Sequence, residues 1–291
     1  MPCLFGKDSY DETDRREKDM KDLVKEVRGV CNRRKKDFLA PHVIILTVVS
    51  MVILCANIGV MYRHNGSSFT DRGFTIFMES QIAGLYPVSY VTMCLVLPSL
   101  ITISWVKRRK SRQDWLCMTR LGYRRTRKDE RMVAALTGGV YAMMMHVSVL
   151  AFLVLSGCPF KGIPNNEGYT DITRYFCQNQ VANTIIYIIM CGIGFALFAL
   201  VIDDICALLN QTVLVRLFGI LLGIGMYVIP CLAQAVLPWI ICEMAVITSL
   251  LVPSAMIMSG EVSPLLGFIL VTVFYTLVDR GLIRVQEKYS D

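Results

Sequence analysis

The amino-acid sequence predicts an all-α integral membrane protein with six transmembrane helices. Hydrophobic residues make up 54% of the 291 residues, charged residues make up 18%, and the mean hydropathy is +0.51. Soluble domains usually carry about 25% charged residues. Charge is also missing from long stretches, because 181–202 contains no Asp, Glu, Lys or Arg and 213–236 contains only Arg216. Such stretches predict membrane-spanning helices, since lipid cannot satisfy exposed backbone polar groups.

The apolar stretches divide the chain into an N-terminal arm, 1–40, and a single transmembrane domain, 41–291. The predicted spans are about 42–62, 85–106, 132–155, 182–202, 213–236 and 262–279. Between the fifth and sixth spans, 239–260 contains Glu243 and Pro253, which favours an outer re-entrant hairpin over a straight helix. The alternative is a seventh full span that places the C-terminus outside.

The distribution of Lys and Arg predicts the orientation, because cytoplasmic loops carry an excess of both. Residues 1–40 and loop 107–131 each contain eleven, whereas loops 63–84 and 156–181 each contain two. We therefore expect a multi-pass plasma-membrane protein whose N-terminal arm and loop 107–131 are cytoplasmic. The C-terminal tail carries three more basic residues and is expected on the same side. Two cytoplasmic ends require an even number of spans, which favours six over seven.

The N-terminal arm predicts an amphipathic helix over 11–38 that lies along the inner membrane surface. One apolar face recurs at helical spacing and includes Met20, Leu23, Val24, Val27 and Cys31. The opposite face is densely basic and would meet anionic lipid headgroups. The alternative is a positive-inside signal with no further role.

Loop 107–131 is more than a run of positive charge. Apolar residues are interleaved with the cations, and Gly122 is expected to end a first helix. The pattern predicts a short amphipathic helix, a turn, and a second helix that enters the membrane. A helix of this kind often docks a partner protein, whereas a simple orientation signal needs only the charges.

Catalytic and nucleotide-binding motifs are absent from the sequence, which contains no GxxxxGK[ST], HExxH or GxSxG. The eleven cysteines include no CxxC pair, which argues against zinc or thioredoxin-like chemistry. Cys158 and Cys177 share an outer loop, where a disulfide and two free thiols are both compatible with the sequence. The net charge of +7 is concentrated at cytoplasmic margins, so nucleic-acid binding is not expected. We expect no enzymatic activity and no bound cofactor.

Ionisable residues inside a membrane are costly and are therefore candidates for function. His146, in the third span, and Glu243, in the outer hairpin, are candidates for a transport pathway or its rim. A packed, hydrogen-bonded histidine is the more common case at a position like His146. Asp203 and Asp204 end the fourth span, and we expect Asp204 to pair with Arg216 across the following turn.

The order of these elements resembles the membrane subunits of type-2 ABC exporters, in particular small bacterial permeases without a fused ATPase. Those proteins have an interfacial N-terminal helix, six spans, a coupling helix between spans 2 and 3, and an outer hairpin between spans 5 and 6. The stretch Arg120-Leu-Gly-Tyr-Arg-Arg125, followed by small residues in the third span, is similar to a motif of these permeases. Asp203-Asp204 departs from the family, where uncharged polar residues are more usual.

The resemblance implies that the chain moves an amphiphilic substrate, such as a lipid, peptide or drug-like molecule. A soluble ATPase subunit would bind ATP-Mg, and a second permease would complete a homo- or heterodimer in membrane lipid. The coupling residues would be Trp115, Leu116, Arg120, Leu121, Tyr123 and Arg124. The alternative is a non-enzymatic membrane receptor or sensor, or an immunity-type membrane protein, without an ATPase partner.

Overall fold

The computed structural model divides the chain into two units, Met1–Pro41 and His42–Asp291, and the second unit holds the described helices. The residues described are 41–65, 77, 86–111, 116, 119–120, 122–157, 180–209, 213–215, 217, 221, 225, 228–229, 232–233, 235–236, 238, 250–251 and 264–290. The predicted interfacial helix of the N-terminal arm lies outside this part of the chain.

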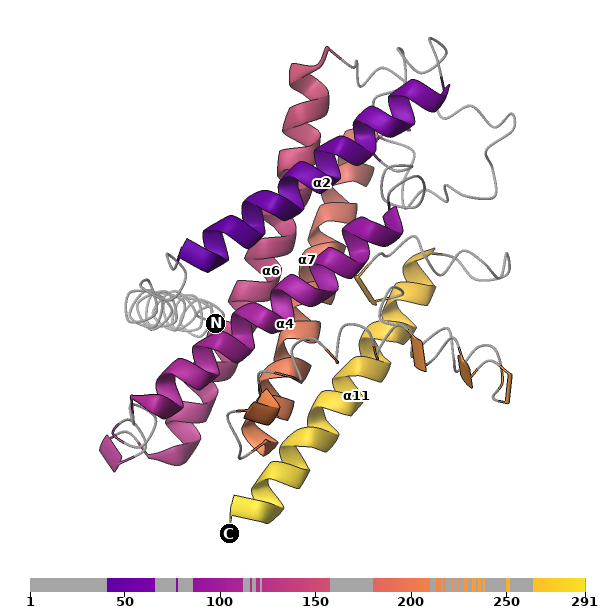
Figure 1. Ribbon diagram of the computed structural model, residues 1–291. Coiled ribbons are helices and arrows are strands. Elements are labelled where there is room, and N and C mark those ends of the chain that lie inside the picture. Colours follow the sequence, from indigo (N-terminus) through magenta and orange to yellow (C-terminus); the bar gives the residue numbers. More distant parts are fainter. Residues whose placement is uncertain are drawn as a thin grey trace, which may run out of the picture. The chain divides into compact units, whose positions relative to one another are not determined.

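Five long helices lie among the residues that the structure describes (Figure 1). They are α2 (Pro41–Asn65), α4 (Tyr86–Lys110), α6 (Tyr123–Leu155), α7 (Gln180–Leu208) and α11 (Pro264–Ser290). The remaining described positions are helical, turn or irregular, so this part of the chain contains no strand. Two of the helices, α2 and α11, begin at a proline, which lacks the N–H that a first turn leaves unpaired.

Three helices are long and apolar enough to cross a membrane among the residues described: Tyr123–Leu155, Val181–Leu208 and Leu265–Lys288. They correspond to the third, fourth and sixth predicted spans. Many large apolar side chains on them are exposed, including Val140, Ile185 and Leu277, as expected where lipid rather than protein covers a helix. The all-α membrane class is therefore confirmed.

The helices extend beyond the predicted spans at one common end. The third span is predicted from 132, but α6 already begins at Tyr123. The second, fourth and sixth are predicted to stop at 106, 202 and 279, whereas α4, α7 and α11 continue to Lys110, Leu208 and Ser290. Figure 1 shows α4, α7 and α11 ending, and α6 beginning, toward the same end of the bundle. Polar extensions of four helices therefore meet there.

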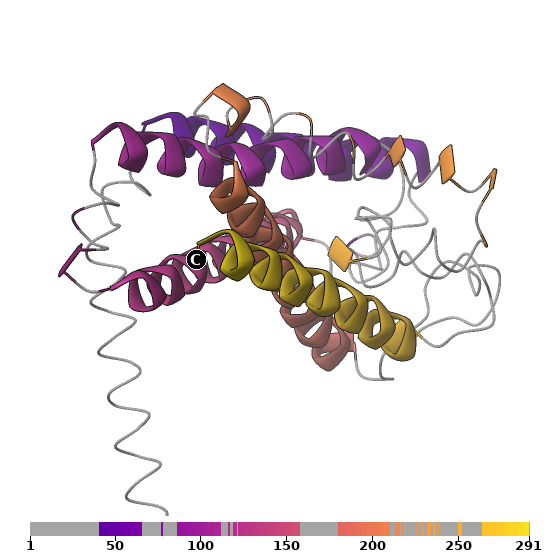
Figure 2. The same ribbon diagram turned by 90° about the horizontal axis from the view of Figure 1, so that it is seen from below.

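α7 is the central helix, and it packs against α4, α6 and α11. Figure 2 shows α4 on one side of α7, with α6 and α11 on the other side. The inward side chains of α7, among them Phe195, Phe198 and Ile202, are fully buried. α6 comes especially close to α7 because Gly138 faces the backbone of Phe195 and the Cβ of Ala199, leaving no room for a side chain. This close packing fixes the register of α6 on α7.

The segment between α7 and α11 is described only at scattered positions. Those between 213 and 233 are helical, in agreement with a helix in the predicted fifth span. In the predicted outer hairpin, Leu250 and Leu251 are helical and buried. The carbonyl of Leu250 lies against Gly194, near the middle of α7, where a Cβ would overlap it. This part of 239–260 therefore reaches the middle of α7.

The turn predicted at Gly122 is confirmed. Gly122 has φ 79° and ψ 153°, a backbone region that is essentially reserved to glycine, and α6 begins at the next residue. Leu116, Thr119 and Arg120 before it are helical. Gly122 thus separates a helical segment of the loop from α6.

Replacing Gly122 with alanine is expected to lower the free energy of unfolding by about 1–2 kcal/mol, because the side chain strains the left-handed backbone. The Cβ itself would meet nothing within 4 Å, so any loss of stability comes from the backbone conformation and not from a steric clash. The measurement is the apparent melting temperature of the purified protein in detergent. Gly281→Ala, in open space within α11, is the control and should be neutral or stabilising. Equal melting temperatures for the two variants would contradict the expectation.

Candidate functional site

A network of buried ion pairs joins the polar ends of four helices, and Arg127 lies at its centre. The Nη1 of Arg127 is 2.7 Å from Asp203 Oδ2 and 3.3 Å from Glu130 Oε2, and its Nη2 is 2.6 Å from Asp204 Oδ1. The Arg127 Nε donates to the side-chain oxygen of Gln286 on α11 at 3.3 Å. One guanidinium of α6 therefore binds groups of both α7 and α11, using the planar, multidentate geometry that lysine lacks.

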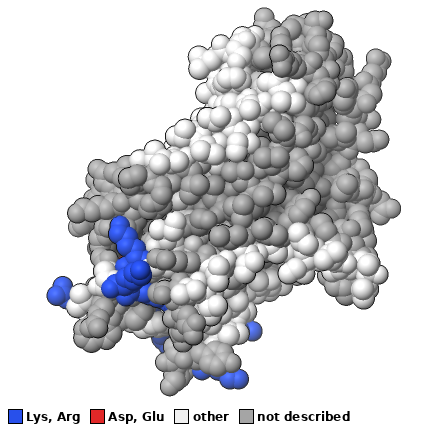
Figure 3. Space-filling view, in the orientation of Figure 1, with Lys and Arg blue, Asp and Glu red and all other residues white. Residues whose placement is uncertain are grey.

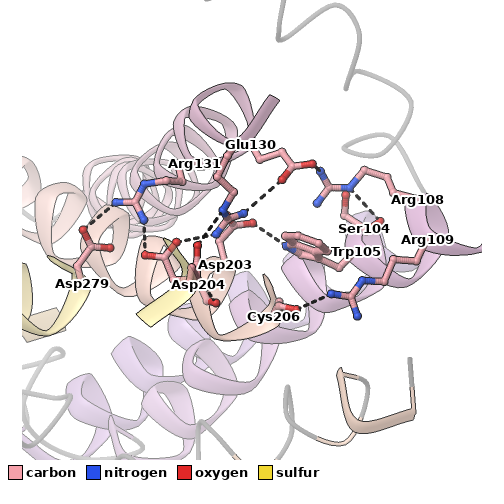
Figure 4. A network of polar contacts seen from close by, with 12 residues as sticks. Ser104, Trp105, Arg108, Arg109, Glu130, Arg131, Asp203, Asp204, Cys206 and Asp279 are labelled. Carbon is pink, nitrogen blue, oxygen red and sulfur yellow. Dashed lines mark hydrogen bonds and ion pairs between the residues drawn. The ribbon is translucent and has the colours of Figure 1, made fainter. Parts of the chain in front are cut away.

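The network extends toward α4 through Arg108 and toward α11 through Arg131 (Figure 4). Toward α4, Arg108 Nη1 binds Glu130 Oε1 at 2.8 Å. Toward α11, Arg131 binds both Asp204 and Asp279, and its Nη2 is 2.7 Å from Asp279 Oδ2. The ion pairs thus connect α4, α6, α7 and α11 continuously.

Trp105 and Arg109 of α4 attach the network to the end of α7. The indole Nε1 of Trp105 donates to Asp203 Oδ1 at 2.7 Å. The guanidinium carbons of Arg108, Arg109 and Arg127 lie 4.7, 5.0 and 5.4 Å from the centre of the indole ring, within cation–π range. Arg109 also donates to the carbonyls of Cys206 (3.0 Å) and Leu209. It therefore caps the C-terminal end of α7, where a cation is favoured.

The charges in the network balance although they are buried. Four carboxylates belong to it, and each of these residues is at most 6% exposed: Glu130, Asp203, Asp204 and Asp279. Their partners are Arg108, Arg127 and Arg131, while Arg109 adds a fourth positive charge on the α7 carbonyls. Unpaired burial of such groups would be very costly, so the network can exist only with its members held together.

Helical spacing explains how each element supplies several members. Arg127, Glu130 and Arg131 are three and four residues apart on α6 and share one face. Trp105, Arg108 and Arg109 have the same spacing on α4. On α11, Asp279 and Gln286 are seven residues apart, and Gln286 also donates to the backbone carbonyl of Asp204 at 2.8 Å. Each helix thus presents a polar face to the network.

The predicted coupling residues that the structure describes lie beside this network but outside it. Leu116 and Tyr123 are 46% and 39% exposed, and Arg120 and Arg124 are also exposed. Trp115 and Leu121 lie outside the described residues. Exposed Lys and Arg side chains gather toward the end of the molecule where α4 ends and α6 begins, and no described Asp or Glu shows on the face in Figure 3. The described charged side chains on this face are therefore basic.

Of the two predicted pathway residues, the structure describes His146 but not Glu243. His146 is buried, its Nδ1 is 2.7 Å from the carbonyl oxygen of Ala142, and its ring packs edge-on against Tyr187 at 5.9 Å. It is therefore packed in the core and hydrogen-bonded, which is the more common case for such a histidine. Glu243 lies outside the described residues.

The expected pairing of Asp204 with Arg216 remains a prediction, because Arg216 also lies outside the described residues. Asp204 is instead seen with Arg127 and Arg131, two partners that the charge pattern of loop 107–131 did not single out. Within the described residues, no group of three His, Cys, Asp or Glu side chains is arranged to hold a metal ion.

The fold and the network define an all-α membrane protein whose helices are joined by buried ion pairs at one end. Comparison with models of known protein families, with curated proteins and with solved structures gives no match.

Proposed function

We propose that this chain is the membrane-spanning permease subunit of an ATP-driven exporter, with ATP-Mg bound by a separate soluble ATPase. In the proposal, two permease subunits form a homo- or heterodimer and move an amphiphilic substrate, such as a lipid, peptide or drug-like molecule. The chain itself binds no cofactor and catalyses no reaction. Its role is to convert movement of the ATPase into movement of membrane helices.

The observation that carries the proposal is the continuity between an exposed apolar docking surface and the ion-pair network. We define the docking surface as Leu116 and Tyr123, on the two sides of the Gly122 turn. Arg127, one helical turn after Tyr123, binds α7 and α11 directly. A force applied at Leu116 or Tyr123 would therefore reach α7 and α11 through charge-assisted hydrogen bonds, which are short and directional.

The six-span arrangement is part of the proposal, with both termini in the cytoplasm of a plasma-membrane protein. α7 and α11 both bring their C-terminal ends to the network, so they run in the same direction. If both cross the membrane, the segment between them must cross an odd number of times. The helical positions between 213 and 233 supply one crossing. Leu250 then belongs to a hairpin that enters the membrane and returns, because a full crossing there would invert α11.

Replacing both Leu116 and Leu121 with aspartate is expected to abolish the binding of an ATPase subunit. The change puts one negative charge at exposed Leu116 of the docking surface, which a partner would have to desolvate, and a second one five residues later in the loop. The measurement is the ATPase activity and the ATPase polypeptide that co-purify with the tagged chain from its native membranes, followed by reconstitution in vesicles.

The control variant is Val285→Asp, which makes the same chemical change at an exposed apolar residue of α11, near the network end. It should retain both binding and ATPase stimulation. Unchanged binding and stimulation in the Leu116→Asp, Leu121→Asp protein would exclude the coupling role of this loop.

A further inference from the structure

The ion-pair network closes one end of the helix bundle with buried charged groups. Apolar side chains of similar volume would hold the helices together at least as well, because each buried charge must first lose its hydration. Charged groups differ from apolar groups in one respect: once the helices separate, water solvates them well. A charged junction can therefore separate without exposing apolar side chains to water, and its groups can pair again with the same partners.

The described contacts place this junction where separation would open the space between four helices. Arg127 and Arg131 leave α6 before its apolar span and bind Asp203, Asp204 and Asp279. Gly122, directly before α6, has a positive φ and marks the start of this helix. Further along, Gly138 holds α6 against the backbone of Phe195. Separation at the network can therefore leave the packing in the middle of α7 in place.

We propose that the network is a latch: its ion pairs hold α4, α6, α7 and α11 together at this end and open reversibly while the centre of the bundle stays packed. The latch follows from the contacts within this chain and does not depend on an ATPase partner. Its open state admits water between the polar ends of the helices.

Two native cysteines of α7 make the latch measurable. Cys206 and Cys191 are both fully buried. Cys206 lies at the network, because its carbonyl accepts a hydrogen bond from Arg109 at 3.0 Å, and Asp203 and Asp204 are three and two residues before it on α7. Cys191 lies in the N-terminal half of the same helix, fifteen residues before Cys206, and both thiols belong to the hydrophobic core. An opening latch exposes the thiol of Cys206 only, whereas unfolding exposes both.

The experiment measures the labelling rates of Cys206 and Cys191 by N-ethylmaleimide in the purified full-length protein in lipid nanodiscs. Each rate comes from mass spectrometry of the α7 peptides and is divided by the rate for the same peptide in the unfolded chain. In the wild-type protein we expect Cys206 to react at least tenfold faster than Cys191. Equal rates would overturn the proposal, because the network would then open no more often than the core around Cys191.

Two variants test whether the ion pairs limit the exposure of the Cys206 thiol. Asp279→Asn weakens the contact of Arg131 with α11 and should raise the Cys206 rate about tenfold, the change in population that corresponds to one hydrogen bond to a charged group. The Cys191 rate should stay within about twofold. Glu287→Gln makes the same change in charge at an exposed position of α11 and should leave both rates unchanged.

Arg127→Gln removes the centre of the network and should raise the Cys206 rate further. If this variant unfolds, both cysteines will react quickly. The labelling rates of the Asp279→Asn variant then test the latch on their own. The latch is contradicted if Asp279→Asn raises the two rates equally or changes neither. Failure of the latch would not affect the test for an ATPase partner, since that test reads co-purification and ATP hydrolysis.

Discussion

Replacing Arg127 with methionine is expected to destabilise the protein by about 3–5 kcal/mol, the cost of removing one partner from a buried ion pair. Methionine fills similar space but leaves the carboxylates of Asp203, Asp204 and Glu130 without their shared cation. Arg131 still binds Asp204, and Arg108 still binds Glu130. The carboxylate of Asp203 therefore loses more electrostatic stabilisation than the other two. The measurement is the apparent melting temperature in detergent, which should fall by several degrees.

The control is Arg124→Met, which removes the same charge three residues earlier on α6 at an exposed position. It should change the stability by no more than about 0.5 kcal/mol. Arg127→Lys is informative as well, because an ammonium group keeps the charge but cannot bind Asp203 and Asp204 in the bidentate manner of a guanidinium. We expect Arg127→Lys to recover only part of the loss. Equal melting temperatures for Arg127→Met and Arg124→Met would show that the network contributes nothing to stability.

Replacing Gly138 with leucine is expected to be the second large effect, with a loss of about 3 kcal/mol or more. A Cβ at this position would lie 2.7 Å from the Cβ of Ala199 and would also overlap the backbone carbonyl of Phe195. Backbone atoms cannot move aside as a flexible side chain can, so α6 must shift away from α7. Loss of the folded, monodisperse peak in detergent, or a strongly lowered melting temperature, is the expected readout.

Gly59→Leu is the matched control, because Gly59 lies within the predicted first span and a Cβ there meets nothing within 4 Å. It should be tolerated, and it gains helix propensity. A graded response is also expected: Gly139→Ala should cost less than Gly138→Ala, since its Cβ would approach the carbonyl oxygen of Gly192 no closer than 3.3 Å. Equal melting temperatures for Gly138→Leu and Gly59→Leu would contradict the close contact between α6 and α7 at Gly138.

The sequence predicted the membrane class and the central part of several spans, because both depend on local hydropathy. It did not predict where the helices end. Hydropathy marks the point at which lipid stops covering a helix, whereas backbone hydrogen bonds can continue through a polar segment that finds partners. Tyr123–Arg131 is such a segment: the pattern of loop 107–131 predicts a helix after Gly122, but it does not indicate that the first turns of α6 carry the centre of the network.

The network itself could not be derived from local sequence, because its partners are far apart in the chain. Arg127 and Gln286 are 159 positions apart, and Arg131 and Asp279 are 148. One signal was nevertheless present. Trp105, Arg108 and Arg109, like Arg127, Glu130 and Arg131, have the spacing of a single helix face. A purely orienting loop needs positive charge but no such spacing, and no acidic residue such as Glu130.

The contribution of Gln286 has a consequence for the way the protein is made. Synthesis proceeds from the N-terminus, so Arg127 and Arg131 of α6 enter the membrane region long before Asp279 and Gln286 of α11 exist. Until α7 and then α11 arrive, these arginines have to stay hydrated or be held by the insertion machinery. Assembly of this end of the bundle is therefore completed only after α11 has been translated, and a chain truncated before Asp279 would lack the α11 partners of Arg127 and Arg131.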